Sequence, residues 1–136
     1  MFEIKQSVLL IDDFLLYFVL SLVVFGLAMY LYMRLTPHQE LPLIRQGNTA
    51  AAISLAGAML GFVLPLASVV ANSVNLGDLL LFAVIALIAQ ALVFLAMSRL
   101  MPGLSQAIEE GNTARATLLA ASSISVGVLN AAALVY

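Results

Sequence analysis

The chain has 136 residues, of which 64% are hydrophobic and 9% are charged, with a formal net charge of −2 and a mean hydropathy of +1.14. Soluble domains are about 45–50% apolar and about 25% charged, so this chain has too few polar residues to cover a water-soluble surface, and a lipid bilayer is its expected solvent. The small net charge and the lack of a basic stretch argue against nucleic-acid binding, the lack of cysteine excludes disulfides and thiolate sites, and one histidine cannot form a histidine cluster.

Four apolar segments are each long enough to cross a hydrocarbon core about 30 Å thick, which takes roughly 20 helical residues. Only helices and closed β-barrels span a bilayer, and the first segment, FLLYFVLSLVVFGLAMYLY, lacks the alternation of a barrel strand. We therefore predict an all-α polytopic membrane protein with four transmembrane helices. The predicted spans are Phe14–Met33, Thr49–Ala71, Leu79–Met97 and Thr113–Tyr136.

The first segment is predicted to be a retained helix rather than a signal peptide. Its apolar run exceeds the about 7–15 residues of a signal peptide, and Asp12 and Asp13 precede it where a signal peptide carries positive charge.

The basic residues predict the orientation, because cytoplasmic loops are enriched in Lys and Arg. The N-terminal segment and the second loop hold only Lys5. The first and third loops hold Arg34, Arg45, Arg99 and Arg115. These two longer loops are therefore predicted to lie in the cytoplasm, with both termini outside it.

The chain reads as a duplicated hairpin. A shift of 65 residues, which becomes 64 after the first loop, aligns several distinctive positions in one order. They are Asp13 with Asp78, Arg34 with Arg99, and Gly47–Ala50 with Gly111–Ala114. We predict two tandem parallel helical-hairpin repeats, residues 1–71 and 72–136, which together form one domain and relate by an axis along the membrane normal.

The repeated charges mark the membrane interfaces. Asp13 and Arg34 are 21 residues apart, or roughly 31 Å of helix, and Asp78 and Arg99 repeat this spacing. An aspartate at a helix start accepts free N–H groups and complements the helix dipole, and an arginine at the end extends to the headgroups. The alternative is a functional Asp–Arg pair.

A short amphipathic helix at the membrane surface is predicted in each of the two longer loops. Each begins near a proline that is followed by aliphatic side chains. These residues are Pro42, Leu43 and Ile44 in the first loop and Pro102, Leu104, Ala107 and Ile108 in the third.

A Gly-Asn-Thr corner follows each surface helix. The glycine is predicted to end the helix in the left-handed conformation, and the asparagine to cap the transmembrane helix that follows. The alternative is that the corners converge on a ligand or ion, since helix N-termini attract anions. The corners are Gly47, Asn48 and Thr49, and Gly111, Asn112 and Thr113.

The second and fourth spans carry small residues at steps of three and four, which keeps them on one helix face. Because small residues let membrane helices approach closely, these two spans are predicted to form the inner packed pair. The alternative is that such faces line a pore in an oligomer. The residues with either role are Ser54, Gly57, Gly61, Ser68, Ser123, Gly127 and Asn130, together with Gln90 of the third span.

Two further side chains within the spans have specific predictions. Gln90 lies near the bilayer centre, where an unpaired amide is costly, and is predicted to bond to a neighbouring helix. Pro65 is predicted to kink the second span.

The sequence shows no set of residues of the kinds that commonly carry out catalysis. The middle of each span lacks ionisable residues, which argues against a proton relay, and no Ser-His-Asp set, metal-ligand cluster or phosphate loop stands out. His38 is predicted to be a solvated loop residue. We therefore expect a protein that is not an enzyme and holds no metal or other cofactor.

The stretches QGNTAAAISLAGAMLGFVLPLA (Gln46–Ala67) and GVLNAA (Gly127–Ala132) resemble the YjfL-type bacterial inner-membrane proteins, a family catalogued as domain of unknown function 350. The resemblance extends over nearly the whole chain. It implies a bacterial plasma-membrane setting, and it implies no catalytic residues.

The leading hypothesis is a non-enzymatic inner-membrane protein that acts as a homo-oligomer, either a small pore or an envelope scaffold whose cytoplasmic loops dock a protein partner. One alternative is a carrier for a small neutral or weakly charged solute, bound between the two hairpins. Another is an accessory subunit of a larger membrane complex.

Overall fold

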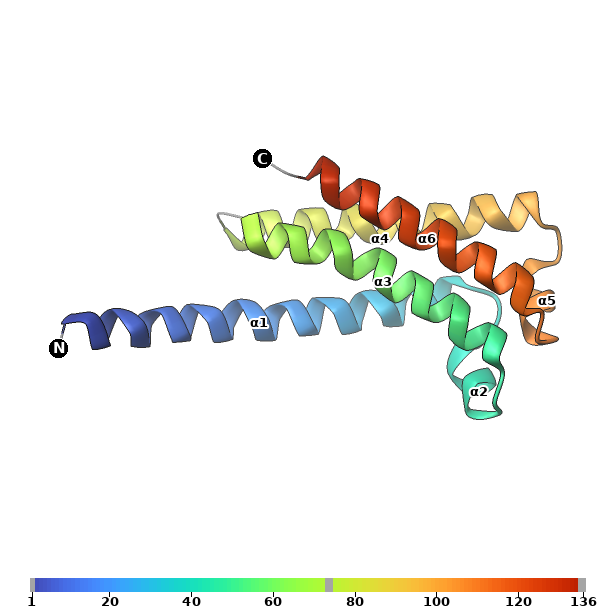
Figure 1. The fold of residues 1–136 in the computed structure, drawn as a ribbon, viewed down its shortest axis with the longest axis horizontal. Coiled ribbons are helices and arrows are strands. Elements are labelled where there is room, and N and C mark those ends of the chain that lie inside the picture. Colours follow the sequence, from blue (N-terminus) through green and yellow to red (C-terminus); the bar gives the residue numbers. More distant parts are fainter. Residues whose placement is uncertain (1, 73–74, 135–136) are drawn as a thin grey trace.

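The computed structural model describes residues 2–72 and 75–134, and within them the chain forms six helices and no strand (Figure 1). The all-α prediction is therefore confirmed for the described chain. The helices are α1 (Phe2–Leu35), α2 (Glu40–Arg45), α3 (Thr49–Asn72), α4 (Leu76–Leu100), α5 (Leu104–Glu109) and α6 (Thr113–Ala133).

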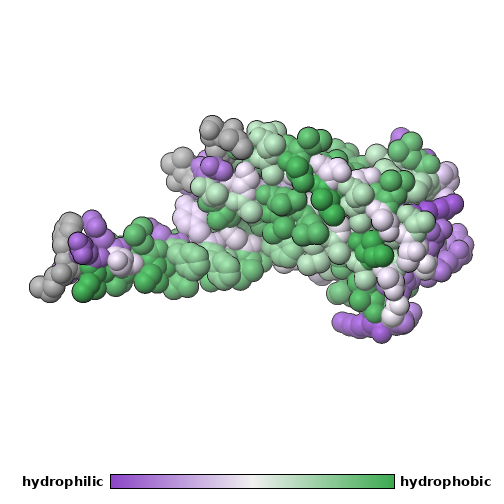
Figure 2. Space-filling view, in the orientation of Figure 1, coloured by the Kyte–Doolittle hydropathy of each residue, from purple (hydrophilic) through white to green (hydrophobic). Residues whose placement is uncertain are grey.

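Four of these helices, α1, α3, α4 and α6, are long and apolar enough to cross a membrane. Figure 2 shows the apolar surface that results along the molecule, with hydrophilic side chains gathered toward its ends. The two short helices α2 and α5 lie in the loops that precede α3 and α6, where surface helices are predicted.

The ends of the helices differ from those of the predicted spans, and α4 covers Leu76–Leu100 rather than Leu79–Met97. Helix α1 begins at Phe2 rather than near Phe14, because the preceding residues, although partly polar, contain no glycine or proline that would end a helix. Hydropathy locates the membrane-crossing part of a helix, not its ends. Helix α6 ends at Ala133, and the predicted end of its span at Tyr136 lies outside the described residues.

Helices α3 and α6 cross in direct contact, and α4 packs against both of them. Helix α1 contacts α3 and α4 through its C-terminal half, while its N-terminal half extends beyond the bundle (Figure 1). Residues Ala28, Met29 and Tyr32 of α1 are buried in this contact. Helix α3 continues through Pro65 without ending, and a kink there stays a prediction.

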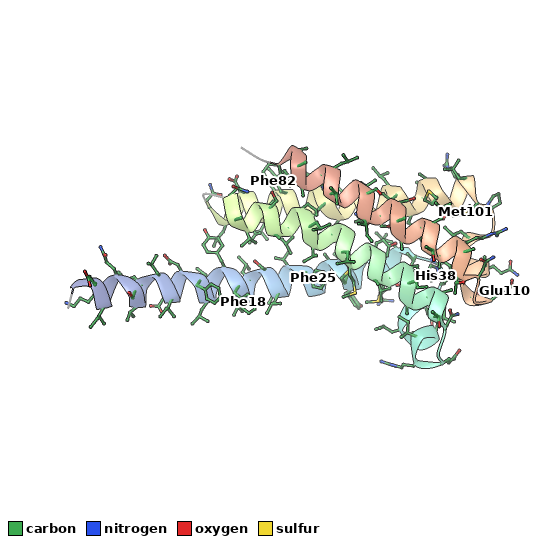
Figure 3. All side chains as sticks on the ribbon, viewed as in Figure 1. Phe18, Phe25, His38, Phe82, Met101 and Glu110 are labelled. Atoms are coloured by element: carbon green, nitrogen blue, oxygen red, sulfur yellow. The ribbon has the colours of Figure 1, made fainter. Side chains whose placement is uncertain are left out.

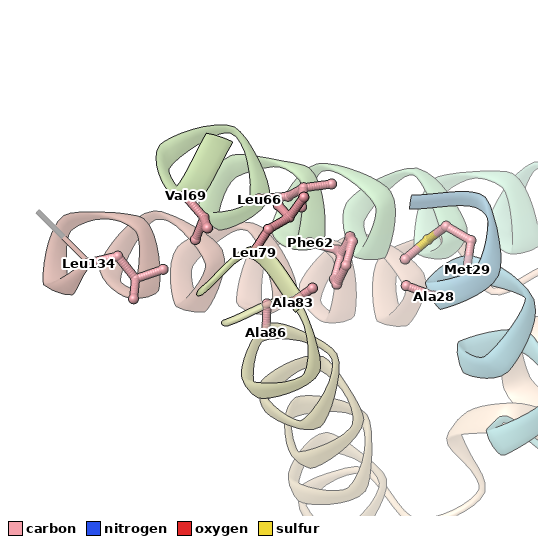
Figure 4. Close-up of a cluster of buried hydrophobic side chains, with 9 residues drawn as sticks. All are labelled: Ala28, Met29, Phe62, Leu66, Val69, Leu79, Ala83, Ala86 and Leu134. Carbon is pink, nitrogen blue, oxygen red and sulfur yellow. The ribbon is translucent and has the colours of Figure 1, made fainter. Parts of the chain in front are cut away.

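Two apolar clusters hold the bundle together. One joins α1, α3 and α4 and reaches Leu134, with Phe62 fully buried at its centre (Figure 4). The other joins α3, α4 and α6 to the surface helix α5, whose Leu104 and Ile108 are inserted into it. Burying aliphatic side chains in this way contributes about 1.5–3 kcal/mol each in water, and here it fixes α5 across one end of the bundle. The duplication of the two hairpins stays a prediction from the sequence.

Candidate functional site

The two Gly-Asn corners have the same backbone geometry. Gly47 and Gly111 have φ angles of +88° and +85°, which side chains with a Cβ rarely adopt. At the first corner, Gly47 N–H donates to the Ile44 carbonyl at 2.9 Å and Asn48 N–H to the Leu43 carbonyl at 2.9 Å. The second corner repeats both bonds, from Gly111 to Ile108 and from Asn112 to Ala107. This is the Schellman pattern that satisfies the last carbonyls of a helix.

Both corner asparagines cap the helix that follows. The Oδ1 of Asn48 accepts from Ala51 N–H at 3.0 Å, and that of Asn112 accepts from Arg115 N–H at 3.1 Å, as predicted for N-caps.

Asn48 also ties α3 to α5. Its Nδ2 donates to the carbonyls of Ile108 at 2.9 Å and Glu109 at 3.2 Å, so both ends of this amide are engaged within the chain. Asn112, Thr49 and Thr113 are exposed. The structure thus gives the first corner a tethering role that the sequence spacing does not indicate, and a ligand at the corners stays a prediction.

The small residues lie where α3 and α6 cross. A Cβ on Gly57 would overlap the Cα of Ala120, and one on Gly61 would overlap the carbonyl of Ser123. A Cβ on Gly127 would in turn overlap the backbone of Gly61. The two helices therefore meet backbone to backbone, which is the contact that small residues permit between membrane helices.

The polar side chains on these faces point into the bundle. Gln90 is 1% exposed and its Nε2 donates to the Ser123 carbonyl at 3.1 Å, which confirms that it bonds to a neighbouring helix. The Oε1 of Gln90 and the Oγ of Ser123 are buried without a partner among the described residues. Ser68 donates to the Ala131 carbonyl at 3.2 Å. The two other polar residues predicted on these faces also lie within the bundle, where Ser54 is buried and Asn130 is half-buried.

Three of the four interface charges lie at helix ends. Arg34 and Arg99 lie in the last turns of α1 and α4, and Asp78 lies in the first turn of α4. Asn75, not Asp78, is the N-cap of α4, because its Oδ1 accepts from Asp78 N–H at 2.9 Å. The expectation that Asp13 starts a helix is wrong, because α1 begins eleven residues earlier, at Phe2 (13 − 2 = 11).

Arg34 is held on its own helix. Its Nε donates to the Tyr30 hydroxyl at 3.1 Å, and its guanidinium lies 5.4 Å from the centre of the Tyr30 ring.

The prediction of a solvated His38 is wrong. His38 is 2% exposed, and its ring packs against Phe94 of α4 with 5.8 Å between ring centroids. Its Nε2 lies 3.2 Å from Glu40 Oε1, and its Nδ1 lies 3.1 Å from Ser105 Oγ in α5. Figure 3 shows His38 toward the end of the bundle that carries α2 and α5.

Glu40 is as deeply buried as His38, with 2% of its surface exposed. Thr36 Oγ1 donates to its Oε1, and its Oε2 has no partner among the described residues. Burial raises the pKa of Glu40 to about 7, against the opposing effect of the Thr36 hydrogen bond. Burial lowers the pKa of His38. His38 and Glu40 are therefore a buried, contacting pair of titratable groups in the segment between α1 and α3.

The side chains of Ser105, His38 and Glu40 lie in a row, in the order of a nucleophilic triad. The sequence did not predict this row. Catalysis also needs a substrate cavity beside the nucleophile. A cavity of about 240 Å³ is bordered by Glu40 together with Arg34 and Tyr30, and not by Ser105. The row links the first loop to α5 through the imidazole of His38. Sequence periodicity could not reveal it, because His38 and Ser105 are 67 positions apart.

A metal centre finds no support among residues 2–72 and 75–134, where no three His, Cys, Asp or Glu side chains are grouped closely enough to hold an ion. A cavity of about 630 Å³ is an open apolar groove between α1 and α3 that Phe18 and Leu66 help to line.

Known proteins resemble this chain over most of its length. The family model described as Domain of Unknown Function (DUF350) matches residues 5–134. The UPF0719 inner membrane proteins YjfL of Escherichia coli strain K12 and of Escherichia coli O157:H7 are each 35% identical over 120 residues, which is 88% of this chain and 91% of the relative. No solved structure matches the chain. These matches confirm the resemblance that the Gly-Asn corners suggest, and the chain belongs to the DUF350 family.

Proposed function

We propose that this protein is a non-enzymatic integral protein of the bacterial inner membrane that works as a homo-oligomer. The observation that supports it is the outward face of α6. Thr117, Ala121 and Ser125 lie on this face at four-residue steps, and all three are exposed in the single chain. Small side chains in this pattern let a second helix approach closely, whereas the α6 residues buried within the chain, Ala120 and Ser123 among them, lie on its other side.

The hydroxyl groups on this face are already satisfied. Thr117 donates to the Thr113 carbonyl at 2.7 Å, and Ser125 donates to the Ala121 carbonyl at 2.7 Å. Because neither hydroxyl needs a partner from outside, a second copy of the chain can pack on this face without leaving a polar group unpaired.

A small pore between copies is the form of this proposal that the packing favours. Within one chain, Gly57 and Gly61 lie directly against α6, so the crossing leaves no room there for a path or a solute. The alternative of a carrier with its site between the hairpins loses support for the same reason. Any path would run between copies, beside the hydroxyl-bearing face of α6.

An envelope scaffold is the second form, and the exposed charges of the loops favour it. Arg45 at the end of α2 and Glu109 and Glu110 at the end of α5 are exposed at the same end of the bundle as the two longer loops. The positive-inside rule predicts that this end faces the cytoplasm, where these side chains could bind a protein partner.

Cysteine cross-linking in membranes tests the oligomer, because the native chain contains no cysteine. Ser125→Cys should give a cross-linked dimer. Val84→Cys is the matched control. Val84 is exposed on α4 and, like Ser125, it lies about two helical turns from the end of the bundle where α4 begins and α6 ends. Equal cross-linking of the two variants, or none in either, would contradict the proposal. Single-channel recording in planar bilayers then separates a pore, which conducts, from a scaffold, which does not.

A further inference from the structure

The row of Ser105, His38 and Glu40, of which His38 and Glu40 are buried, has no part in the oligomer described above. We propose that Glu40 and His38 form a proton-binding site that fastens the first loop to α5 and loosens it when the proton leaves to water. The site is independent of the α6 face, so its test and the cross-linking test can fail separately.

The geometry makes this pair a link between the two loops. His38 lies in the first loop and Ser105 lies in α5, with 3.1 Å between Nδ1 and Oγ. On its other side the imidazole contacts Glu40, the first residue of α2, with 3.2 Å between Nε2 and Oε1. A change at Glu40 therefore reaches α5 through a single imidazole ring.

The charge of the pair depends on one proton. With one titrating proton shared between the carboxyl and the imidazole, the pair is neutral overall, whichever of the two groups holds it. Without that proton the pair carries a negative charge, and a buried charge is costly unless it is well paired. Because Glu40 Oε2 is buried without a partner among the described residues, the ionised carboxylate needs water.

Glu40 borders a cavity that can hold water. Glu40 forms part of the wall of the cavity of about 240 Å³, which lies between the end of α1 and the start of α2 and is bordered also by Gln39 and Leu41. Such a cavity is roomy enough for several water molecules, each of which takes about 30 Å³. Hydration of the carboxylate from this side would draw residues 36–40 away from α5.

Among the groups that surround Glu40 and His38, this pair is the site that responds to pH. Helix α1 contributes Arg34 at the cavity, where it is held on Tyr30, and the Tyr32 phenol, which interacts electrostatically with Glu40. Helix α4 contributes the uncharged ring of Phe94, and α5 contributes Ser105. The charged residues of the loop helices, Arg45, Glu109 and Glu110, are exposed.

The direction of the response follows from the burial of each group. Burial raises the pKa of Glu40 to about 7, so the pair gives up its proton as the pH rises through the neutral range. Burial lowers the pKa of His38, so the imidazole does not take up a charge there. The loop is fastened on the acidic side of neutral and loosened on the alkaline side.

A distance measurement between the loops tests the proposal on the full chain. Spin labels at Gln39→Cys and Gln106→Cys, both exposed positions, report the separation of the first loop from α5 in lipid nanodiscs. We expect a narrow distance distribution at pH 6 and a broader, longer one at pH 8.5. Glu40→Gln cannot lose the proton and should stay narrow at both values, while the exposed-carboxylate control Glu109→Gln should respond like the parent.

An unchanged distribution in the parent, or a pH response that persists in Glu40→Gln, would overturn the proposal. If Glu40→Gln does not fold, the imidazole decides the matter, because His38 is the only histidine in the chain. Its side-chain NMR signals in the unsubstituted protein should show a pKa below about 6.5 and a second step near neutral pH from its carboxyl neighbour. A single step with the pKa of a solvated histidine would refute the site.

Discussion

Gly61 of α3 and Gly127 of α6 lie against each other with no side chain between them, so that a Cβ on Gly127 would overlap the carbonyl oxygen and Cα of Gly61. The two predicted hairpins are thus joined at their backbones, between two helices that are long and apolar enough to cross the membrane. In a bilayer, where lipid tails are as apolar as leucine, such close packing replaces the hydrophobic effect as the force between helices.

Gly57→Leu should separate α3 from α6, because its side chain would occupy the space of the Ala120 backbone. Inserting a large side chain into a packed contact costs about 1–3 kcal/mol or more, and we expect a clearly lower midpoint of thermal unfolding in detergent. Val23→Leu is the control, since Val23 is 58% exposed on α1 and should tolerate the change. Equal midpoints for the two variants would contradict close packing as the basis of the fold.

The two corner asparagines offer a matched pair of substitutions. Asn48→Ala removes the cap of α3 and the two bonds to α5, whereas Asn112→Ala removes the cap of α6. A lost cap costs about 1 kcal/mol, and each further hydrogen bond adds about 0.5–1.5 kcal/mol. Asn48→Ala should therefore lower the unfolding midpoint more. A larger loss with Asn112→Ala would show that the tie to α5 contributes nothing.

The helices and corners were predictable because each rests on local chemistry. Apolar length sets a span, a glycine with positive φ ends a surface helix, and an asparagine caps the next one. Gly47 and Gly111 show this directly, with φ angles within a few degrees of each other. Even the α3–α6 contact follows from small residues at helical spacing, since only such faces allow two backbones to meet.

The buried row was not predictable, because the burial of a polar loop residue is decided by distant parts of the chain. Phe94 and Ser105 cover His38, and they lie on α4 and α5, far from it in sequence. A histidine flanked by proline and glutamine gives no local sign of this contact. The start of α1 was not predictable for another reason. Hydropathy locates the apolar part of a helix that can cross a membrane, whereas α1 continues beyond the predicted part.

Glu40 should make stability depend on pH in a specific direction. A group whose folded-state pKa lies above its unfolded value contributes stability that is fully present below the unfolded pKa and is lost as the pH rises through the folded one. For Glu40 this window runs from the ordinary glutamate pKa of 4.5 up to about 7. Protonation of His38 in the unfolded state changes the stability in the opposite direction, but only below about pH 6.5, the ordinary pKa of histidine. The effect of Glu40 on stability can therefore be measured separately above this pH.

The measurement is the difference in unfolding midpoint between the parent protein and Glu40→Gln, taken at several pH values from 6.5 to 8. The parent should lose stability relative to Glu40→Gln as the pH rises, because only the parent acquires the buried charge. Glu110→Gln, an exposed carboxylate on the same side of the molecule, should run parallel to the parent. A difference that stays constant across the range would mean that Glu40 does not titrate there.

The predicted orientation can be checked with two single cysteines at opposite ends of the bundle. Leu76→Cys at the start of α4 is 40% exposed and leaves the Asn75 cap in place, whereas Gln106→Cys lies exposed on α5. Because the arginines gather in the two longer loops, the positive-inside rule predicts that a membrane-impermeant thiol reagent reaches Leu76→Cys once the outer membrane is breached. Gln106→Cys should react only after the inner membrane is also permeabilised. The reverse pattern would place α2, α5 and the His38–Glu40 pair outside the cytoplasm, where the pair would respond to external rather than cytoplasmic pH.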